Sequence, residues 1–275
     1  MKKNKEKNTL DPLIEQFYNL GLEKDRLKQG IEQLERERIL TILKKNLPSA
    51  PAEVLDVGGA AGSYAFLLAE QGYEVHLIDP VPLHIEQARE VAKATNVKLA
   101  SYTVGDGRSI DKDDCSADVV LFLGPLYHLV EYQDRLKALK EAHRILKPNG
   151  LLVAAAIPRF AFFIYGIYQG AFLDPTYREI VREDLSSGQH RTTEARYFTT
   201  AYLHHPVQLR NEIEESGFKN VSLYSVHGPV WHEEAIEKLK SNREAWESFL
   251  SFLEMIEKEE SIIGASAHIL AIARK

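Results

Sequence analysis

The sequence is poor in cysteine and has no excess of basic charge. Cys115 is the single cysteine in 275 residues, which excludes an internal disulfide framework and favours a reducing compartment. The formal net charge is −6, so no global basic field attracts nucleic acid or anionic lipid. No apolar core follows the lysine-rich residues 1–8, so we do not expect a signal peptide. These absences predict a cytoplasmic globular protein with no nucleic-acid or membrane partner.

An apolar segment that could cross a membrane is also missing. The longest apolar stretch, residues 151–173, contains Pro158 and Arg159. A central arginine opposes membrane insertion by about 2.5–3.5 kcal/mol. We therefore expect this stretch to divide into a buried strand, 151–157, and an apolar helical segment, 160–169.

Strands and helices alternate through the middle of the chain. Short apolar runs are followed by helical patterns five times, which indicates a parallel, doubly wound α/β sheet. A turn is expected at Pro148–Asn149–Gly150, just before the fifth strand. The expected strands are 54–57, 74–78, 97–104, 117–123 and 151–157, with a closing pair at 218–226 and 267–273.

The chain divides, on this pattern, into an N-terminal helical cap, residues 1–50, and an α/β domain, residues 51–275. Two insertions, about 158–206 and 228–261, follow the fifth and sixth strands. The first is rich in Phe and Tyr and the second is largely helical. Since insertions at the carboxyl edge of such a sheet often become lids, we predict that both hold substrate. The second could instead form a dimer surface.

The segment Val54–Gly62 places a run of small residues directly after an apolar strand. Such loops let the backbone approach a nucleotide at the carboxyl edge of a parallel sheet. A dinucleotide fingerprint beginning at Gly58 needs glycine at positions 60 and 63, where this chain has Ala60 and Ser63. The spacing is instead D-x-G-x-A-x-G, which disfavours a nicotinamide-dependent oxidoreductase.

This pattern resembles the first motif of the class I S-adenosylmethionine-dependent methyltransferases, D-x-G-x-G-x-G, from which Ala60 departs. The segments 106–108, 123–128 and 146–151 resemble later motifs of that family, in the same order. The resemblance implies a Rossmann-like α/β fold with seven strands, mainly parallel, the last antiparallel and inserted beside the fifth. It also implies S-adenosyl-L-methionine as cofactor and S-adenosyl-L-homocysteine as product. The cofactor contacts it implies are Gly58, Gly59, Ala60, Gly62, Asp79, Pro80, Asp106, Gly107 and Leu123.

Two carboxylates follow strands at positions suited to the nucleoside. Asp79 ends the second strand and can accept both ribose hydroxyls, although it could simply cap the helix that begins near Pro82. By resemblance, Asp106 accepts from the adenine amino group; the alternative is a plain Asx turn. Asp56, before the loop, is at least as easily explained by a structural role.

Tyr127 and His128 follow the fourth strand, where the resemblance places the transferred methyl group and the acceptor. Histidine is well suited to removing a proton near neutral pH, so we predict His128 as a base, with Tyr127 beside it. A purely structural His128 remains equally open, because alignment alone supplies much of the acceleration of methyl transfer. In the N-terminal cap, Arg38 is our choice for an arginine that meets the methionine carboxylate.

Two other signatures are missing. No Asn/Asp-Pro-Pro-Tyr/Phe motif follows the fourth strand, which disfavours amide and nucleobase-amine methyltransferases. His204 and His205 are merely adjacent, and no spaced His/Asp/Glu cluster suggests a metal site, so we expect none.

The sequence therefore predicts an S-adenosylmethionine-dependent methyltransferase (EC 2.1.1.-) that acts on a small molecule, as a monomer or homodimer. The alternatives are a non-catalytic S-adenosylmethionine-binding protein and a nucleic-acid or protein methyltransferase.

Overall fold

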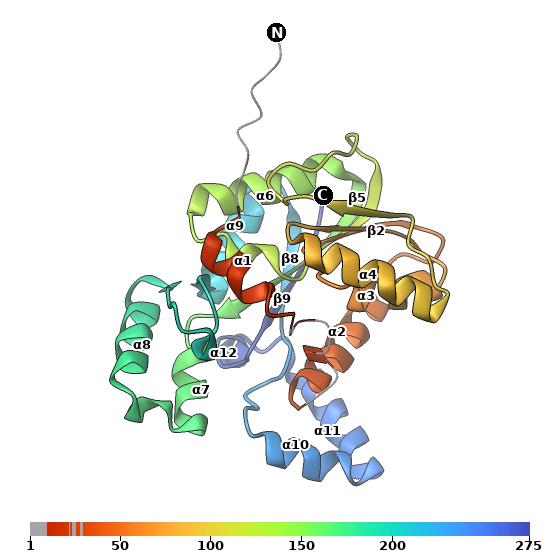
Figure 1. Ribbon diagram of the computed structural model, residues 1–275. Coiled ribbons are helices and arrows are strands. Elements are labelled where there is room, and N and C mark those ends of the chain that lie inside the picture. The colour runs from red at the N-terminus through yellow and green to blue at the C-terminus, as the bar shows by residue number, and fades with distance from the viewer. Residues whose placement is uncertain (1–9, 22, 24–25, 28–29) are drawn as a thin grey trace.

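A computed structural model of the chain describes residues 10–21, 23, 26–27 and 30–275 (Figure 1). Five strands form a parallel sheet in the order β3–β2–β1–β4–β5. These strands are β1 (Glu53–Val57), β2 (Glu74–Asp79), β3 (Ser101–Val104), β4 (Ala117–Phe122) and β5 (Leu146–Pro158).

The last strand is antiparallel and lies beside the fifth. β9 (Ile269–Arg274) pairs with β5 on one side and with β8 (Lys219–Ser225) on the other. This is the seven-stranded, mainly parallel arrangement that the sequence predicts, and it is confirmed. Two short strands, β6 (Gln189–His190) and β7 (Ala201–His204), form an antiparallel ribbon, and β7 also pairs with the end of β5.

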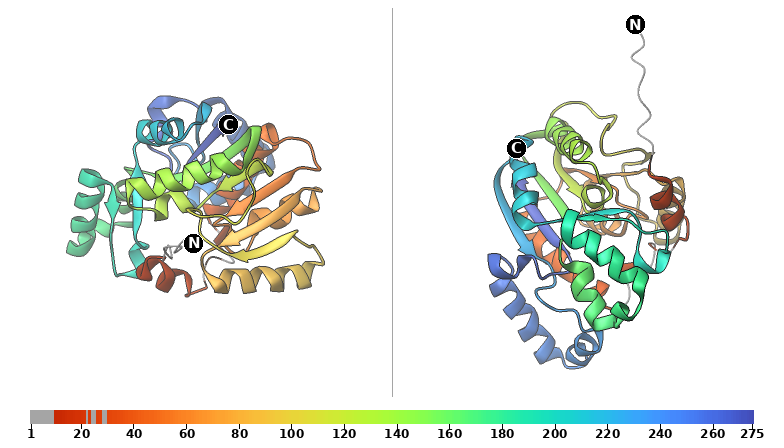
Figure 2. Two further views of the ribbon diagram at one scale, coloured as in Figure 1. Left: turned by 90° about the horizontal axis from the view of Figure 1, so that it is seen from above. Right: turned by 90° about the vertical axis from the view of Figure 1, so that its left-hand side faces the viewer.

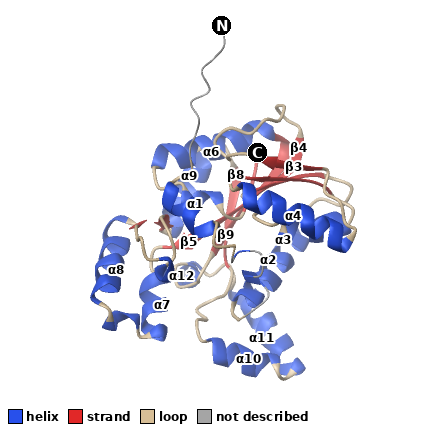
Figure 3. Ribbon diagram, in the orientation of Figure 1, coloured by secondary structure: helices blue, strands red, loops and turns tan. Residues whose placement is uncertain are grey.

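Helices cover both faces of the sheet (Figures 2 and 3). Apolar side chains of α2 (Glu32–Asn46), α3 (Ser63–Glu70) and α4 (Pro82–Thr95) pack on one face. Those of α6 (Tyr132–Ile145) and α9 (Pro206–Glu215) pack on the other. Because both faces are covered, the central strands are buried along nearly their whole length, as their continuous apolar sequences require.

Two local expectations were wrong. The third strand begins at Ser101 rather than at residue 97. The expected turn at Pro148–Asn149–Gly150 lies within β5, where the pairing with β4 shifts register. Asn149 has a positive φ of 63°, so the turn-forming residues produce a bulge in a continuous strand instead of a strand boundary.

The two insertions lie in different places. The first contains α7 (Ala161–Gln169), α8 (Pro175–Ser187) and the β6–β7 ribbon, beyond the end of β5. The second contains α10 (Glu233–Lys240), α11 (Arg243–Ile256) and α12 (Glu260–Ile263), and α10 and α11 lie beside α2 (Figure 1). No described helix is long and apolar enough to cross a membrane.

Candidate active site

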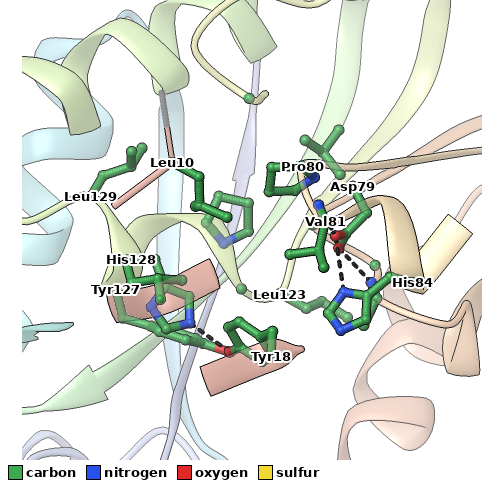
Figure 4. A pocket seen from close by; sticks show the side chains of 18 of the residues that line it. Leu10, Tyr18, Asp79, Pro80, Val81, His84, Leu123, Tyr127, His128 and Leu129 are labelled. Atoms are coloured by element: carbon green, nitrogen blue, oxygen red, sulfur yellow. Dashed lines mark hydrogen bonds and ion pairs between the residues drawn. The ribbon is translucent and has the colours of Figure 1, made fainter. Parts of the chain in front are cut away.

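A cavity of about 410 Å³ opens at the carboxyl ends of β1, β2 and β4, and α1 (Pro12–Tyr18) forms part of its wall. This volume lies within the range of ligand pockets in proteins. Asp79 and His84 lie on one side of the cavity, Tyr127 and His128 lie on the other, and Tyr18 of α1 lies between them (Figure 4). The cavity therefore joins the loop after β1 to the segment after β4.

The loop after β1 follows a tight course set by three residues with positive φ. Gly58 has φ 70°, and a Cβ there would approach Pro125 to 2.8 Å. Gly62 has φ 85° and precedes α3. Ala60 also has a positive φ, 49°, so the loop turns where the family motif has glycine, at a cost of about 1–2 kcal/mol. Ala60 is thus held in a backbone conformation that glycine adopts without this cost.

Asp79 connects this loop to the start of α4. Its Oδ2 accepts from the Ala60 N–H at 2.9 Å, and its Oδ1 accepts from the Val81 N–H at 2.9 Å. Nδ1 of His84 lies 2.9 Å from the same Oδ1 (Figure 4). Nε2 of His84 is buried and has no hydrogen-bond partner in the part of the chain that the structure describes. His84 lines the cavity and was not predicted from the sequence, although it lies only five residues after Asp79.

Asp56 lies beneath the loop in an apolar environment. The side chain is buried, and neither carboxylate oxygen has a described hydrogen-bond partner of normal geometry. Burial and the neighbouring charge of Asp79 raise the pKa of Asp56 to about 7. A Cβ at Gly59 would come within 2.5 Å of this carboxylate, so Asp56 packs directly against the loop.

Asp106 lines the cavity and also binds Arg108. The Arg108 backbone N–H donates to Asp106 Oδ1 at 2.7 Å, which is an Asx turn, and the guanidinium contacts both carboxylate oxygens. Arg108 also pairs with Asp134. The turn that the sequence analysis left open is therefore present, and an adenine contact by Asp106 stays a prediction.

His128 is held between two hydrogen-bond partners at the end of α5 (Pro125–His128). Its Nδ1 lies 3.1 Å from the carbonyl oxygen of Thr200, which can only accept, so Nδ1 carries the proton. Its Nε2 then accepts from the Tyr18 hydroxyl at 2.6 Å (Figure 4). Desolvation lowers the pKa of His128 to about 4, so the imidazole is neutral at physiological pH. Burial raises the pKa of the neighbouring Tyr127 phenol.

Arg38 lies away from the cavity. It is fully buried, and its guanidinium pairs with Glu257, just after α11. Arg26 lines the cavity instead, and it donates to the Glu35 carboxylate at 2.9 and 3.1 Å and to Glu23 at 2.8 Å. Burial raises the pKa of Glu35, but the Arg26 guanidinium outweighs it and lowers that pKa to about 2.

Only the first insertion reaches the cavity among the described residues. Arg191 and Thr200 line it, and Phe198 contacts Phe17 of α1 edge to face, with ring centroids 5.3 Å apart. No described residue of 228–261 lines it. Ile236 and Leu253 of the second insertion pack on Leu34 of α2 instead.

Part of the chain is similar to known methyltransferases. Residues 54–150 match the family model described as a methyltransferase domain. An uncharacterized methyltransferase of Mycobacterium tuberculosis is 34% identical over 106 residues, which are 38% of this chain and 40% of that protein. The chain thus matches well under half of the length of this curated relative.

Two further similarities extend over nearly the whole chain. The tRNA 5-carboxymethoxyuridine methyltransferase of Escherichia coli is 24% identical over 271 residues, 96% of this chain and 95% of that protein. A crystal structure from Thermotoga maritima, described as an S-adenosylmethionine-dependent methyltransferase and possible histamine N-methyltransferase, has a TM-score of 0.57. It is 17% identical and covers 96% of this chain and 98% of its own.

Proposed function

We propose that this chain, which belongs to the class I S-adenosylmethionine-dependent methyltransferases, transfers a methyl group to a small-molecule acceptor. The observation that carries the proposal is a single cavity that joins the Gly58–Gly62 loop and Asp79 to Tyr127 and His128. Cofactor-binding residues and acceptor-facing residues thus share one space, as methyl transfer requires.

The residues at the loop end of the cavity fit the cofactor. Gly58 and Gly59 line the cavity without side chains, so the backbone of the loop is open to a ligand there. The buried Nε2 of His84 has no partner among the described residues. We assign the ribose to Asp79, whose carboxylate can accept more than its present hydrogen bonds, and we retain Pro80, Gly107 and Leu123 as further contacts. The bound cofactor supplies a methyl group on a positively charged sulfur, which is a strong electrophile.

Arg26 and Glu35 suit the amino-acid end of the cofactor better than Arg38 does. Both line the cavity, and together they present a guanidinium and a carboxylate side by side. The guanidinium of Arg26 is complementary to the carboxylate group of methionine, and Glu35 holds this guanidinium at the cavity wall. We therefore assign this role to Arg26, which replaces our choice of Arg38.

The other end of the cavity favours a compact organic acceptor. α1 covers it, and the contacts of Tyr18 with His128 and of Phe17 with Phe198 hold this cover in place. A macromolecular acceptor would have to displace α1. Acidic Asp11, Glu131 and Asp134 also line the cavity and disfavour a phosphate backbone.

His128 has the protonation state of a base. Its proton is on Nδ1. Nε2 is unprotonated, and its lone pair accepts the hydrogen bond from the Tyr18 hydroxyl. An acceptor N–H or O–H that replaces the Tyr18 hydroxyl would meet the same lone pair. We propose that His128 removes or holds this proton while Tyr127 lines the acceptor site.

A second candidate acceptor is a tRNA nucleobase, because the full-length similarity to the E. coli tRNA enzyme favours it. Arg191 at the cavity supplies an exposed cation, and it has no ion-pair partner among the described residues. The net charge of −6 argues against this candidate.

One experiment separates these possibilities. The chain is incubated with S-adenosylmethionine that carries a radiolabelled methyl group, together with either a metabolite extract or bulk tRNA. Asp79→Ala, at a donor concentration too low to saturate it, serves as the control of reduced activity. Label in small molecules is the expected result. Label in tRNA would show that the acceptor is tRNA and not a small molecule, and methyl transfer itself would still stand. Donor binding without any transfer would favour the non-catalytic binding protein.

A further inference from the structure

Glu35, His227 and His268 come together behind the Arg26 side of the cavity. They belong to α2, to the segment after β8 and to the segment before β9, and so lie far apart in sequence. One potential ligand atom from each lies within 4.8 Å of the other two. We propose that these three side chains bind a divalent transition-metal ion of the Zn²⁺ or Fe²⁺ type, against the sequence-based expectation of no metal site.

The unsatisfied hydrogen bonding of His227 and His268 supports the binding of an ion between them. His227 is 1% exposed, and the Nδ1 atoms of His227 and His268 are both buried without a hydrogen-bond partner in the described chain. Nδ1 of His268 lies 3.4 Å from Oε2 of Glu35 without hydrogen-bond geometry. Buried polar atoms are nearly always satisfied, so two orphaned imidazole nitrogens in one cluster with a carboxylate need an explanation. A metal ion between them satisfies all three groups.

The donor set selects the type of metal. Two imidazoles and one carboxylate form a set that zinc and non-haem iron sites use, with positions left open for water or another ligand. Mg²⁺ and Ca²⁺ prefer oxygen ligands and fit it poorly. Histidine coordinates metals as the neutral imidazole, through either Nε2 or Nδ1.

Arg26 is compatible with an ion at this place. Its two bonds to Glu35 use only part of the carboxylate, which has about four lone-pair sites. Arg26 also pairs with Glu23, so the one guanidinium faces two carboxylates and the cluster keeps one net negative charge. Of the three proposed ligands, Glu35 lines the cavity, so the site borders the cavity on that side.

The ion would have a positioning role that does not depend on the acceptor. It would join α2 to the ends of β8 and β9 and hold Glu35, and through Glu35 also Arg26, at the cavity wall. The Tyr127 ring lies 6.4 Å from the His268 ring, so the acceptor side of the cavity also borders the site.

The test uses tag-free full-length protein, stripped with a chelator and then titrated with Zn²⁺ or Co²⁺. Metal content, the visible spectrum of Co²⁺ and thermal stability are measured. About one ion per chain is expected, with a tetrahedral or five-coordinate Co²⁺ spectrum and a rise in melting temperature on binding. His227→Gln and His268→Gln should each weaken binding at least about tenfold, since even changes outside the ligand set cost 10–100-fold.

His76→Gln is the matched control. Glu53, Glu74 and His76 form a second such cluster, but both His76 nitrogens already have partners, Ser101 at 2.7 Å and Glu53 at 2.6 Å. This variant should bind metal as the wild type does. Absence of stoichiometric binding by the folded wild type would overturn the proposal, as would binding that survives in both ligand variants. If a variant is unfolded by circular dichroism, Glu35→Gln takes its place.

Discussion

The Tyr18 hydroxyl donates a hydrogen bond of 2.6 Å to Nε2 of His128, and this bond connects the N-terminal helix to the residue that we propose as the base. The two residues are 110 positions apart in sequence. This bond helps to hold α1 over the end of the cavity where the methyl acceptor would bind. It also occupies the Nε2 lone pair that His128 needs in order to act as a base. An acceptor must therefore displace Tyr18 from His128.

Tyr18→Phe should loosen α1. A hydrogen bond of this kind contributes about 0.5–1.5 kcal/mol, so amide exchange in residues 12–18 should accelerate about 2–10-fold, as measured by mass spectrometry. Tyr132→Phe is the matched control, because Tyr132 bonds to Glu215 at an exposed position and does not itself line the cavity. Equal exchange in wild type and Tyr18→Phe would show that this bond does not hold α1.

His128→Asn should lower the maximal rate of methyl transfer by about 10²–10⁴-fold, the usual contribution of a general base. Donor affinity should stay nearly constant, because the residues assigned to the cofactor lie at the other end of the cavity. The measurement is steady-state kinetics with the identified acceptor, beside calorimetry of the donor. A variant with the wild-type rate would make His128 a structural residue.

The low pKa of His128 predicts how the stability of the protein and the rate of methyl transfer depend on pH. Burial lowers the pKa of this group to about 4, below the ordinary value of 6.5 in the unfolded chain. Between these values the unfolded state binds more protons, so the contribution of His128 to stability is fully present above pH 6.5. It is lost as the pH falls towards 4. A rate limited by protonation of His128 in this state should likewise fall only as the pH approaches 4, and a fall centred near 6.5 would contradict it.

Asp79→Ala should weaken binding of S-adenosylmethionine by about 1.5–3 kcal/mol, the usual scale for hydrogen bonds to a charged group. The loss has two sources, the proposed ribose contacts and the bond that holds the Ala60 N–H. Asp113→Ala, at an exposed carboxylate, is the control for calorimetry. Unchanged affinity in Asp79→Ala would remove Asp79 from the cofactor site.

Arg26 and Arg38 should give opposite results. Arg26→Gln should raise the dissociation constant of the donor about tenfold or more, because a charge-assisted contact is lost. Arg38→Met should leave the buried Glu257 with only its contact to Lys45 at 3.6 Å, and lower the free energy of unfolding by at most about 3–5 kcal/mol. Donor affinity of the folded Arg38→Met protein should change little. Loss of donor affinity in the Arg38 variant alone would return the contact with the methionine carboxylate to Arg38.

The sequence was informative where structure is local. The strand before Gly58, the small residues of the loop and the carboxylate at Asp79 are close in sequence, and the alternation of strands with helices predicts the parallel sheet. The position of the last strand beside the fifth was implied by the family resemblance and not by the alternation. Arg26 could not be separated from Arg38, because both lie in the helical N-terminal region and only packing decides which one faces the cavity. Likewise, Glu35, His227 and His268 meet only through the fold, so no spacing could reveal them.

Calorimetry with S-adenosylmethionine, S-adenosylhomocysteine and NAD tests the central assignment of the cavity most directly. The first two compounds should bind at about one molecule per chain, both should bind more weakly to Asp79→Ala, and NAD should not bind. Binding of NAD, or failure of the folded wild-type protein to bind either sulfur compound, would contradict the assignment of this cavity to a methyl donor.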